Sequence, residues 1–490
     1  MFEVAELGLA ITGEEFDSRA PQLHLRLLEA QRALSSTRHT VLILLSGVEG
    51  AGKGELVSRL HEWFDTKGIQ TAAFWDETDE ENLRPRYWRF WRAMPARGKI
   101  GIMFGSWYTE PFIERVYDKI DDEEFERRLE EINEFETLLR DDGVIIIKLW
   151  FHMPKDKVEK QLERDEKKHI KKLRISPYTK RFARYFDKFI HAAQLAIRKT
   201  DTDIPWHIVE ATDGHYRDIT AGQIILDVMN EHLDPKTKPA TKKAHFAAES
   251  VERAPPLASV DLTQKLDDVS YQRKLQKWQG ELHALAWRAR ELGKSVVVVF
   301  EGWDAAGKGS TIQRMIKAVD ARLFRVITTG APTDEEAAHH YLWRFWRHVP
   351  MPGNFTIYDR SWYGRVLVER VEKLASQEEW YRAYDEINLF EQQLSDHNIL
   401  VLKFWLHISP EEQLRRFDAR ENDPLKNHKL TKEDWRNRDK RKEYELAVNE
   451  MVAHTSTICA PWNLIAAEDK QFARIEVLRI LSKALKQELK

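Results

Sequence analysis

One feature constrains the fold of this chain more than any other: its sequence repeats after 255 residues. Residues 87–95 read YWRFWRAMP and residues 342–350 read LWRFWRHVP, and the triplet SWY at 106–108 returns at 361–363. The triplet EIN at 131–133 returns at 386–388, and Gly47 and Gly302 stand at the same displacement. Solenoid repeats are only about 20–45 residues long, so we expect two homologous domains in tandem.

The rest of the pattern predicts where these domains lie and what class they belong to. We expect a first domain at residues 1–233 and a second at 260–490, joined by a linker at 234–259 that holds several prolines and lysines and shows no apolar periodicity. Each domain starts with an amphipathic helical pattern, followed by an apolar strand at 40–45 or 295–300. Later apolar runs at 143–149 and 398–404 lie between helical patterns. This alternation is typical of α/β domains, with a parallel sheet covered by helices on both faces.

Composition excludes several classes of protein. Of 490 residues, 42% are hydrophobic and 32% are charged, which is too apolar for a disordered chain. No apolar run approaches the roughly 18 residues of a membrane span, and the N-terminus lacks a secretory pattern, so we expect a cytoplasmic protein without membrane contact. The single cysteine, Cys459, excludes a disulfide framework, and the net charge of -3 gives no reason to expect nucleic acid as a partner.

A glycine-rich loop follows the first strand of the second domain. Gly302, Gly307 and Lys308 have the spacing G-x-x-x-x-G-K of a phosphate-binding loop, in which backbone N–H groups at a helix N-terminus surround phosphate oxygens. The usual hydroxyl directly after the lysine is replaced by Gly309, and Ser310 comes one residue later, a form that resembles nucleoside monophosphate kinases. The alternative is a glycine turn that only packs strand against helix.

The first domain repeats this loop in altered form. Gly47 and Lys53 are kept, Glu49 replaces Asp304, and Glu55 stands where the second domain has Ser310. We therefore expect that the first domain retains phosphate binding without chemistry.

A second polar motif, YDRSWYGR at residues 358–365, follows a short predicted strand. Asp359 and Arg360 should then lie at the carboxyl edge of the sheet, where open α/β folds bind ligands. The aspartate suits Mg²⁺, and Arg360 and Arg365 suit phosphate oxygens. The first domain has Phe104, Gly105 and Glu110 at these positions. A surface ion pair between Asp359 and Arg360 is the alternative.

Two further stretches have competing interpretations. Residues 415–442 hold 11 lysines and arginines against 6 acids, and residues 160–188 hold 11 against 4. Such runs are usually solvated helix faces, but beside a phosphate loop a basic lid is the better hypothesis. The aromatic residues Trp343, Phe345 and Trp346 suit either adenine stacking or core packing, and their helical spacing favours the core.

These motifs together resemble the polyphosphate kinase type 2 family. The blocks that carry the resemblance are residues 302–309, 359–365, 423–426 and 460–462. The resemblance covers nearly all of the second domain and, weakened, the first. It implies two P-loop kinase-like domains with a basic helical lid, of which the second is catalytic. Family members with two fused copies transfer a phosphoryl group from inorganic polyphosphate to AMP and yield ADP.

The resemblance also implies roles for individual residues. Asp304, Lys308, Asp359, Arg360 and Arg365 would be catalytic, with Asp304 and Asp359 as ligands of Mg²⁺, for which Mn²⁺ is a substitute. The expected phosphate-binding residues are Gly302, Ala306, Gly307, Gly309, Ser310, Lys426, Arg436 and Arg438. We also expect that this chain can form a homo-oligomer.

Two rival functions stay open. An ATP-dependent nucleoside monophosphate kinase shares the loop and the fold, although it needs no stretch as cationic as 415–442. A non-catalytic polyphosphate-binding regulator suits the first domain alone.

Overall fold

The computed structural model describes residues 1–160, 184–234, 255–424, 427 and 430–490. The chain divides into two compact units, of which unit 1 comprises Met1–Glu77 and Ala93–Lys242. Unit 2 comprises Thr78–Arg92 and Lys243–Lys490. The segment Thr78–Arg92 thus belongs to the first repeat by sequence but groups with unit 2, which the sequence did not predict. Most of the predicted linker lies outside the described residues.

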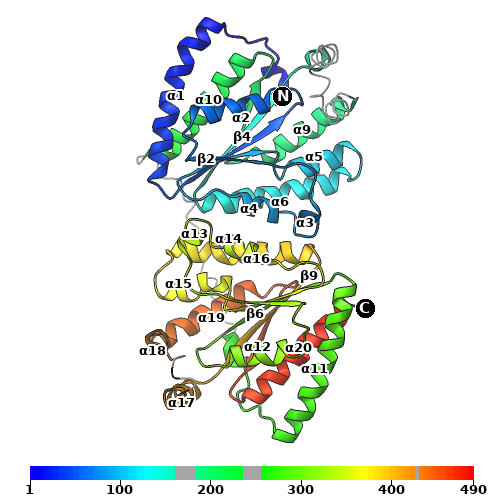
Figure 1. Ribbon diagram of the computed structural model, residues 1–490, viewed down its shortest axis with the longest axis vertical. Coiled ribbons are helices and arrows are strands. Elements are labelled where there is room, and N and C mark those ends of the chain that lie inside the picture. The colour runs from blue at the N-terminus through cyan, green and yellow to red at the C-terminus, as the bar shows by residue number, and fades with distance from the viewer. Residues whose placement is uncertain (161–183, 235–254, 425–426, 428–429) are drawn as a thin grey trace. The chain divides into compact units, whose positions relative to one another are not determined.

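The first repeat is built on a five-stranded sheet with the order β2-β3-β1-β4-β5, in which all pairs are parallel. Its strands are β1 (Thr40–Gly47), β2 (Ile69–Ala73), β3 (Ile100–Phe104), β4 (Val144–His152) and β5 (Trp206–Glu210). Its described helices are η1 (Phe2–Ala5), α1 (Gly13–Ser35), α2 (Lys53–Trp63), α3 (Asp79–Asn82), α4 (Trp88–Ala93), α5 (Thr109–Val116), α6 (Asp122–Asp141), α9 (Phe186–Thr200) and α10 (Gly214–Leu233). Figure 1 shows α1, α2 and α10 over one face of the sheet and α5, α6 and α9 over the other.

The second repeat has the same architecture, with the order β10-β9-β6-β8-β7. Its strands are β6 (Ser295–Gly302), β7 (Phe324–Thr328), β8 (Phe355–Asp359), β9 (Ile399–His407) and β10 (Trp462–Ala466). Its described helices are η2 (Pro256–Ser259), α11 (Asp268–Glu291), α12 (Lys308–Ile316), α13 (Asp334–Ala337), α14 (Trp343–Trp346), η3 (Trp362–Arg365), α15 (Val368–Val371), α16 (Gln377–Asp396), α17 (Pro410–Glu421), α18 (Lys432–Asp439), α19 (Arg441–Thr455) and α20 (Lys470–Glu488). Helices α11, α12 and α20 pack together on one side, and α15, α16 and α19 pack together on the other.

Strand register confirms the repeat residue by residue. Val41 lies opposite Ile100 in the first sheet, and Val296 lies opposite Phe355 in the second, a displacement of 255 on both strands. Residues 296–300 of β6 are all buried because helices cover both faces of the sheet. The predicted α/β class with parallel sheets is confirmed.

The topology places a switch point at the carboxyl end of the central strand β6. The chain passes from β6 to β7 and β8 on one side, and then to β9 and β10 on the other. Ligands of open α/β sheets bind at such a switch point, beyond the carboxyl ends of the strands. Phe300 pairs with Asp359, so the glycine loop after β6 and the motif after β8 leave the sheet at the same edge, as predicted.

Two smaller expectations also have outcomes. Trp343, Phe345 and Trp346 are buried, so the core interpretation of this aromatic block is confirmed. The last residues of the predicted linker instead form η2, where the N–H of Leu257 donates to Asn449 Oδ1 at 3.0 Å. Leu257 is buried because η2 packs on α19.

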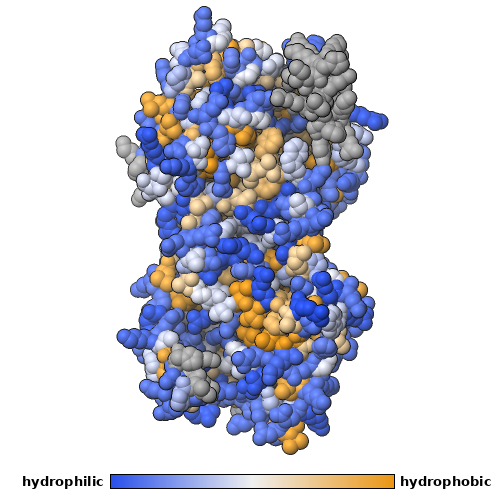
Figure 2. Space-filling view, in the orientation of Figure 1, coloured by the Kyte–Doolittle hydropathy of each residue, from blue (hydrophilic) through white to orange (hydrophobic). Residues whose placement is uncertain are grey.

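Charged and polar side chains dominate the molecular face in Figure 2, and apolar side chains form limited patches on it. Among the described residues, no helix combines the length and apolar character that crossing a bilayer requires.

Candidate active site

The loop between β6 and α12 has the geometry of a phosphate-binding loop. Gly302 adopts a φ of 149°, and a Cβ there would lie 2.6 Å from the carbonyl oxygen of Leu406, so only glycine fits. Gly307 has a φ of 107° and caps α12, whose first residue is Lys308. Lys308 Nζ donates to the carbonyl oxygens of Gly302 at 2.7 Å and Trp303 at 3.3 Å. The loop thus lies at a helix N-terminus, which attracts anions.

Two of the predicted phosphate ligands are already engaged within the loop. Ser310 Oγ donates to the carbonyl oxygen of Gly307 at 3.0 Å, and the N–H of Ala306 donates to the carbonyl oxygen of Trp303 at 3.0 Å. These bonds stabilise the turn. A phosphate contact through either group would require these bonds to rearrange.

The second motif lies beside this loop, as the sequence predicted. Arg360 Nη2 donates to Asp304 Oδ1 at 3.0 Å. Asp359 faces the first turn of α12, because a Cβ placed on Gly309 would lie 3.9 Å from Asp359 Oδ2. Asp359 and Arg360 therefore lie beside the loop that carries Asp304 and Lys308.

The remaining predicted cations have other partners in the structure. Arg365 pairs with Glu369 at 3.1 Å, and its guanidinium lies 4.5 Å from the ring centre of Tyr341. Arg436 pairs with Glu372 at 3.3 Å. Arg438 Nη1 donates to the carbonyl oxygen of Pro410 at 2.7 Å and to Gln413 Oε1 at 3.2 Å. Lys426 lies outside the described residues.

Three polar side chains that the sequence did not single out bind the predicted site. Asn437 Nδ2, on α18, donates to Asp304 Oδ2 at 2.9 Å, and Gln413 Nε2, on α17, donates to the backbone oxygen of Asp304 at 3.2 Å. Glu433 lies 3.8 Å from Arg360. Their only sequence signal is their place within or beside the basic stretch 415–442.

Arg416, on α17, supports the loop from within the protein. It is 5% exposed. Its guanidinium donates to four backbone oxygens, which belong to Ala305, Ala306, Ala467 and Glu468 at 3.0, 3.0, 2.7 and 2.9 Å. Part of the basic stretch is therefore internal structure and not a solvated helix face.

The indole of Trp303 is held by a neutral histidine. Its Nε1 donates to His407 Nδ1 at 3.0 Å, and the guanidinium of Arg441 lies 4.1 Å from the indole centre. Burial, helped by the positive charge of Arg441, lowers the pKa of His407 to about 4. The imidazole is consequently neutral near pH 7 and accepts the indole N–H.

The first repeat keeps the loop, but a nearby carboxylate compensates the positive charge of its lysine, Lys53. Lys53 Nζ donates to the carbonyl oxygens of Gly47 at 3.1 Å and Val48 at 2.8 Å, and it pairs with Glu49 at 3.7 Å. Burial lowers the pKa of Lys53. A Cβ at Gly52 would collide with the guanidinium of Arg217.

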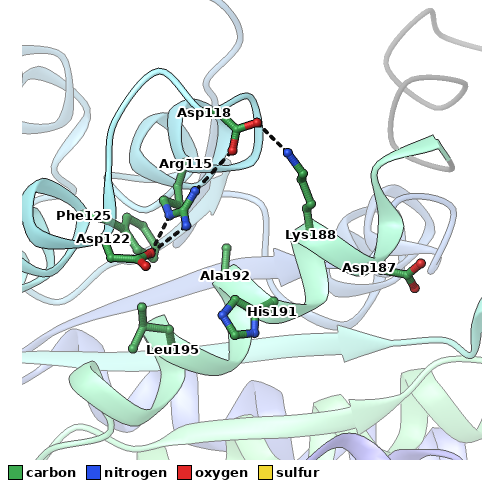
Figure 3. A pocket seen from close by; sticks show the side chains of 9 residues that line it. All are labelled: Arg115, Asp118, Asp122, Phe125, Asp187, Lys188, His191, Ala192 and Leu195. Carbon is green, nitrogen blue, oxygen red and sulfur yellow. Dashed lines mark hydrogen bonds and ion pairs between the residues drawn. The ribbon is translucent and has the colours of Figure 1, made fainter.

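A pocket in the first repeat lies between α5, α6 and α9, with a volume of about 330 Å³ (Figure 3). Four of its charged residues pair with one another: Arg115 binds Asp122 at 2.7 Å and Asp118 at 3.4 Å, and Lys188 also binds Asp118. The fifth, Asp187, pairs with Lys155 at 2.6 Å. Phe125 contributes an apolar wall. The pocket is not formed by the glycine loop, and its charged side chains already have ion-pair partners.

These observations define a class of protein: two tandem α/β domains of the phosphate-binding-loop type, of which the second carries the fuller set of polar groups. The family model of polyphosphate kinase 2 matches residues 11–237 and again 265–490. The chain belongs to the polyphosphate kinase 2 family.

Full-length relatives agree with this assignment. The chain is 43% identical over 489 residues to the polyphosphate:AMP phosphotransferase of Pseudomonas aeruginosa, covering 99% of this chain and 98% of that protein. It is 38% identical to the polyphosphate:AMP phosphotransferase of Acinetobacter johnsonii, covering 95% and 96%. A crystal structure of a Pseudomonas aeruginosa protein described as polyphosphate kinase 2 superposes with a TM-score of 0.87 at 42% identity, covering 100% of this chain and 99% of that one.

Proposed function

We propose that this chain transfers a phosphoryl group from inorganic polyphosphate to AMP and releases ADP. The observation that carries the proposal is full-length similarity to proteins named polyphosphate:AMP phosphotransferase. The second repeat supports it with a loop, two carboxylates and an arginine gathered at the carboxyl edge of its sheet.

In the proposed reaction, an oxygen of the AMP phosphate attacks the terminal phosphorus of polyphosphate. A new P–O bond forms there while the bond to the bridging oxygen breaks, so polyphosphate leaves one unit shorter. Phosphoryl transfer requires mainly positioning and charge stabilisation. Lys308 and the α12 N-terminus would hold phosphate oxygens, and Arg360 would stabilise charge in transfer. Arg365 would contribute only if its guanidinium left Glu369 and bound a phosphate oxygen instead.

The residues present suit a divalent cation. Asp304 and Asp359 supply carboxylate oxygens, and the absence of a side chain at Gly309 leaves room beside Asp359 Oδ2. Mg²⁺ is often held by one or two carboxylates plus substrate phosphates, and Mn²⁺ accepts the same donors. Among the described residues there is no group of three or more His, Cys, Asp or Glu that would hold a metal without substrate. A bound Mg²⁺ would neutralise negative charge on the phosphate oxygens.

The test is an assay of purified protein with long-chain polyphosphate, AMP and Mg²⁺ in the absence of ATP. We expect ADP to form, and we expect the reverse reaction, because the anhydride bonds broken and made are of the same kind. Product formation with ATP alone as donor would favour the ATP-dependent kinase. Binding of polyphosphate without turnover would favour the regulator.

Cytoplasmic location and a homo-oligomeric state stay predictions. Cell fractionation and light scattering of the purified chain test them directly.

A further inference from the structure

A comparison of the two repeats separates residues that serve the common fold from residues that serve the site of the second repeat. In the second repeat, the buried Lys403 Nζ binds Glu391 Oε2 at 2.7 Å and the hydroxyl of Tyr363 at 2.8 Å. In the first repeat, Lys148 binds Glu136 and Tyr108 in the same way, at 2.9 and 3.4 Å. A network kept by both copies, including the copy without Asp359 and Arg360, serves the common fold.

Glu301 behaves differently, because only the second repeat has it. It lies on β6 immediately before the glycine loop and is 5% exposed. Its Oε1 accepts a hydrogen bond from Ser361 Oγ at 2.9 Å. The first repeat has Ser46 at this position, although it keeps the partner hydroxyl as Ser106. A buried carboxylate is costly to maintain, so its presence in one copy alone requires a local reason.

Backbone strain at Arg360 occurs in the same repeat as this carboxylate. This residue has a φ of 63°, which is unfavourable for residues other than glycine. The first repeat has Gly105 at this position, with a φ of 83°. Two bonds from β6 flank the strained residue: the N–H of Arg360 donates to the carbonyl oxygen of Phe300 at 3.1 Å, and Ser361 donates to Glu301. The repeat with the strained arginine has the carboxylate, and the repeat with the relaxed glycine lacks it.

We propose that Glu301 is a positioning residue for the second repeat: its hydrogen bond with Ser361 holds Arg360 in the strained conformation that directs its guanidinium to Asp304. The same bond fixes the end of β8, and with it Asp359, against the loop of Lys308. Burial raises the pKa of Glu301, and the nearby charges of Lys308 and Arg360, together with the Ser361 hydrogen bond, offset this rise only in part. This inference rests on the proposed function, because it concerns the geometry of that reaction.

The experiment compares Glu301→Ala, Glu301→Gln and Ser361→Ala, with Ser106→Ala as the matched control in the first repeat. Steady-state kcat and KM for AMP are measured with polyphosphate as donor, and thermal unfolding is followed in parallel. Small displacements of positioned groups cost up to about 10²-fold in rate. We therefore expect kcat of Glu301→Ala to fall about 10- to 100-fold with little change in KM. Glu301→Gln should stay near wild type, because its amide oxygen still accepts the Ser361 hydrogen bond.

The double variant gives a sharper criterion, because two substitutions that break the same hydrogen bond should not have additive effects on kcat. Ser361→Ala should lower kcat as Glu301→Ala does, and the double variant should be no worse than the more damaging single variant. Ser106→Ala should keep the wild-type kcat. Amide hydrogen exchange of residues 360–363 should accelerate in Glu301→Ala and Ser361→Ala, which is a readout independent of turnover.

A folded Glu301→Ala with wild-type kcat and unchanged exchange at 360–363 would overturn the inference. If Glu301→Ala does not fold, a wild-type kcat in Ser361→Ala overturns it equally. Failure of the proposed function is distinguishable, because the wild-type chain would then form no ADP while the exchange measurement would still report the positioning bond.

Discussion

At the scale of single residues, the second repeat keeps unfavourable backbone conformations that the first has relaxed. Ala305 and Arg360 have φ values of 64° and 63°, and the equivalent residues of the first repeat are Gly50 and Gly105, at 84° and 83°. A non-glycine residue in this region costs of order 1 kcal/mol or more. Strain of this kind persists at functional sites where many surrounding contacts hold the residue in place. The pairwise replacement by glycine beside the loop therefore agrees with the prediction that the first repeat has lost the chemistry.

His407 gives a prediction at this scale. Its pKa of about 4 in the folded protein lies below the roughly 6.5 of an unfolded chain, so the unfolded state binds the proton first as pH falls. The stability that the neutral imidazole contributes is complete above about pH 6.5 and is lost as pH falls towards 4. Between pH 6.5 and 4.5 this loss amounts to about 2 kcal/mol.

Urea unfolding of wild type and His407→Asn across this pH range measures the effect. The Asn side chain offers an acceptor to Trp303 but does not titrate, so the variant should lose about 2 kcal/mol less stability over the same range. Parallel pH profiles for the two proteins would show that His407 is protonated in the folded state or that its titration does not affect stability.

At the scale of elements, the basic stretch divides into internal and exposed arginines. Arg415 and Arg416 are neighbours on α17 and both bind Glu412, yet their side chains are 77% and 5% exposed. Arg416 links the loop after β6 to the segment after β10. The helix that begins the predicted lid thus anchors the phosphate-binding loop through its buried face.

Arg416→Met should destabilise unit 2 by about 3–5 kcal/mol, because Glu412 and the loop carbonyls lose a buried partner. Arg415→Met, the matched exposed change, should cost at most about 1 kcal/mol. Thermal unfolding of the two variants measures the difference. Equal losses would mean that the four backbone contacts of Arg416 contribute little to stability.

The elements show what sequence reasoning reached and where it stopped. The strand at 295–300 and the short strand before the motif at 358–365 were predicted, and they correspond to β6 and β8. Apolar runs and the glycine spacing are local signals, and parallel-sheet geometry then places the ends of these strands at one edge. Asn437, Arg416 and Glu301 were missed. Asn437 and Arg416 contact loop residues more than 100 positions away, and a single Glu inside an apolar strand has no periodic signature. Arg365 was grouped with Arg360 because both belong to the motif at 358–365 and to the family resemblance, but in the structure Arg365, on η3, pairs with Glu369.

At the scale of the whole molecule, one architecture occurs twice with unequal sites. Strand order, register and the buried lysine networks are common to both repeats. Asp359, Arg360 and Glu301 belong to the second alone. Polyphosphate binding by the first repeat stays a prediction, since most of its basic stretch at 160–188 lies outside the described residues. What the described part shows is a loop lysine, Lys53, already paired with Glu49.

This asymmetry leads to a prediction about the two loop lysines. Lys308→Ala removes a preorganised cation from the repeat that has Asp304, Asp359 and Arg360, so kcat should fall by at least about 10²- to 10³-fold. Lys53→Ala makes the same change in the first repeat, where Phe104 and Gly105 stand at the positions of Asp359 and Arg360. It should lower kcat much less.

The pair of variants is its own control for two bonds, because each lysine donates to two carbonyl oxygens of its own loop; Lys53→Ala removes the ion pair with Glu49 in addition. Loss of loop stability should therefore be no smaller in Lys53→Ala than in Lys308→Ala, so a larger fall of kcat in Lys308→Ala reports the chemistry. ADP formation from polyphosphate and AMP, measured per folded molecule, gives that difference. Equal losses in the two variants would mean that both loops turn over substrate, which would require groups other than Asp359 and Arg360 to stabilise the transferred charge in the first repeat.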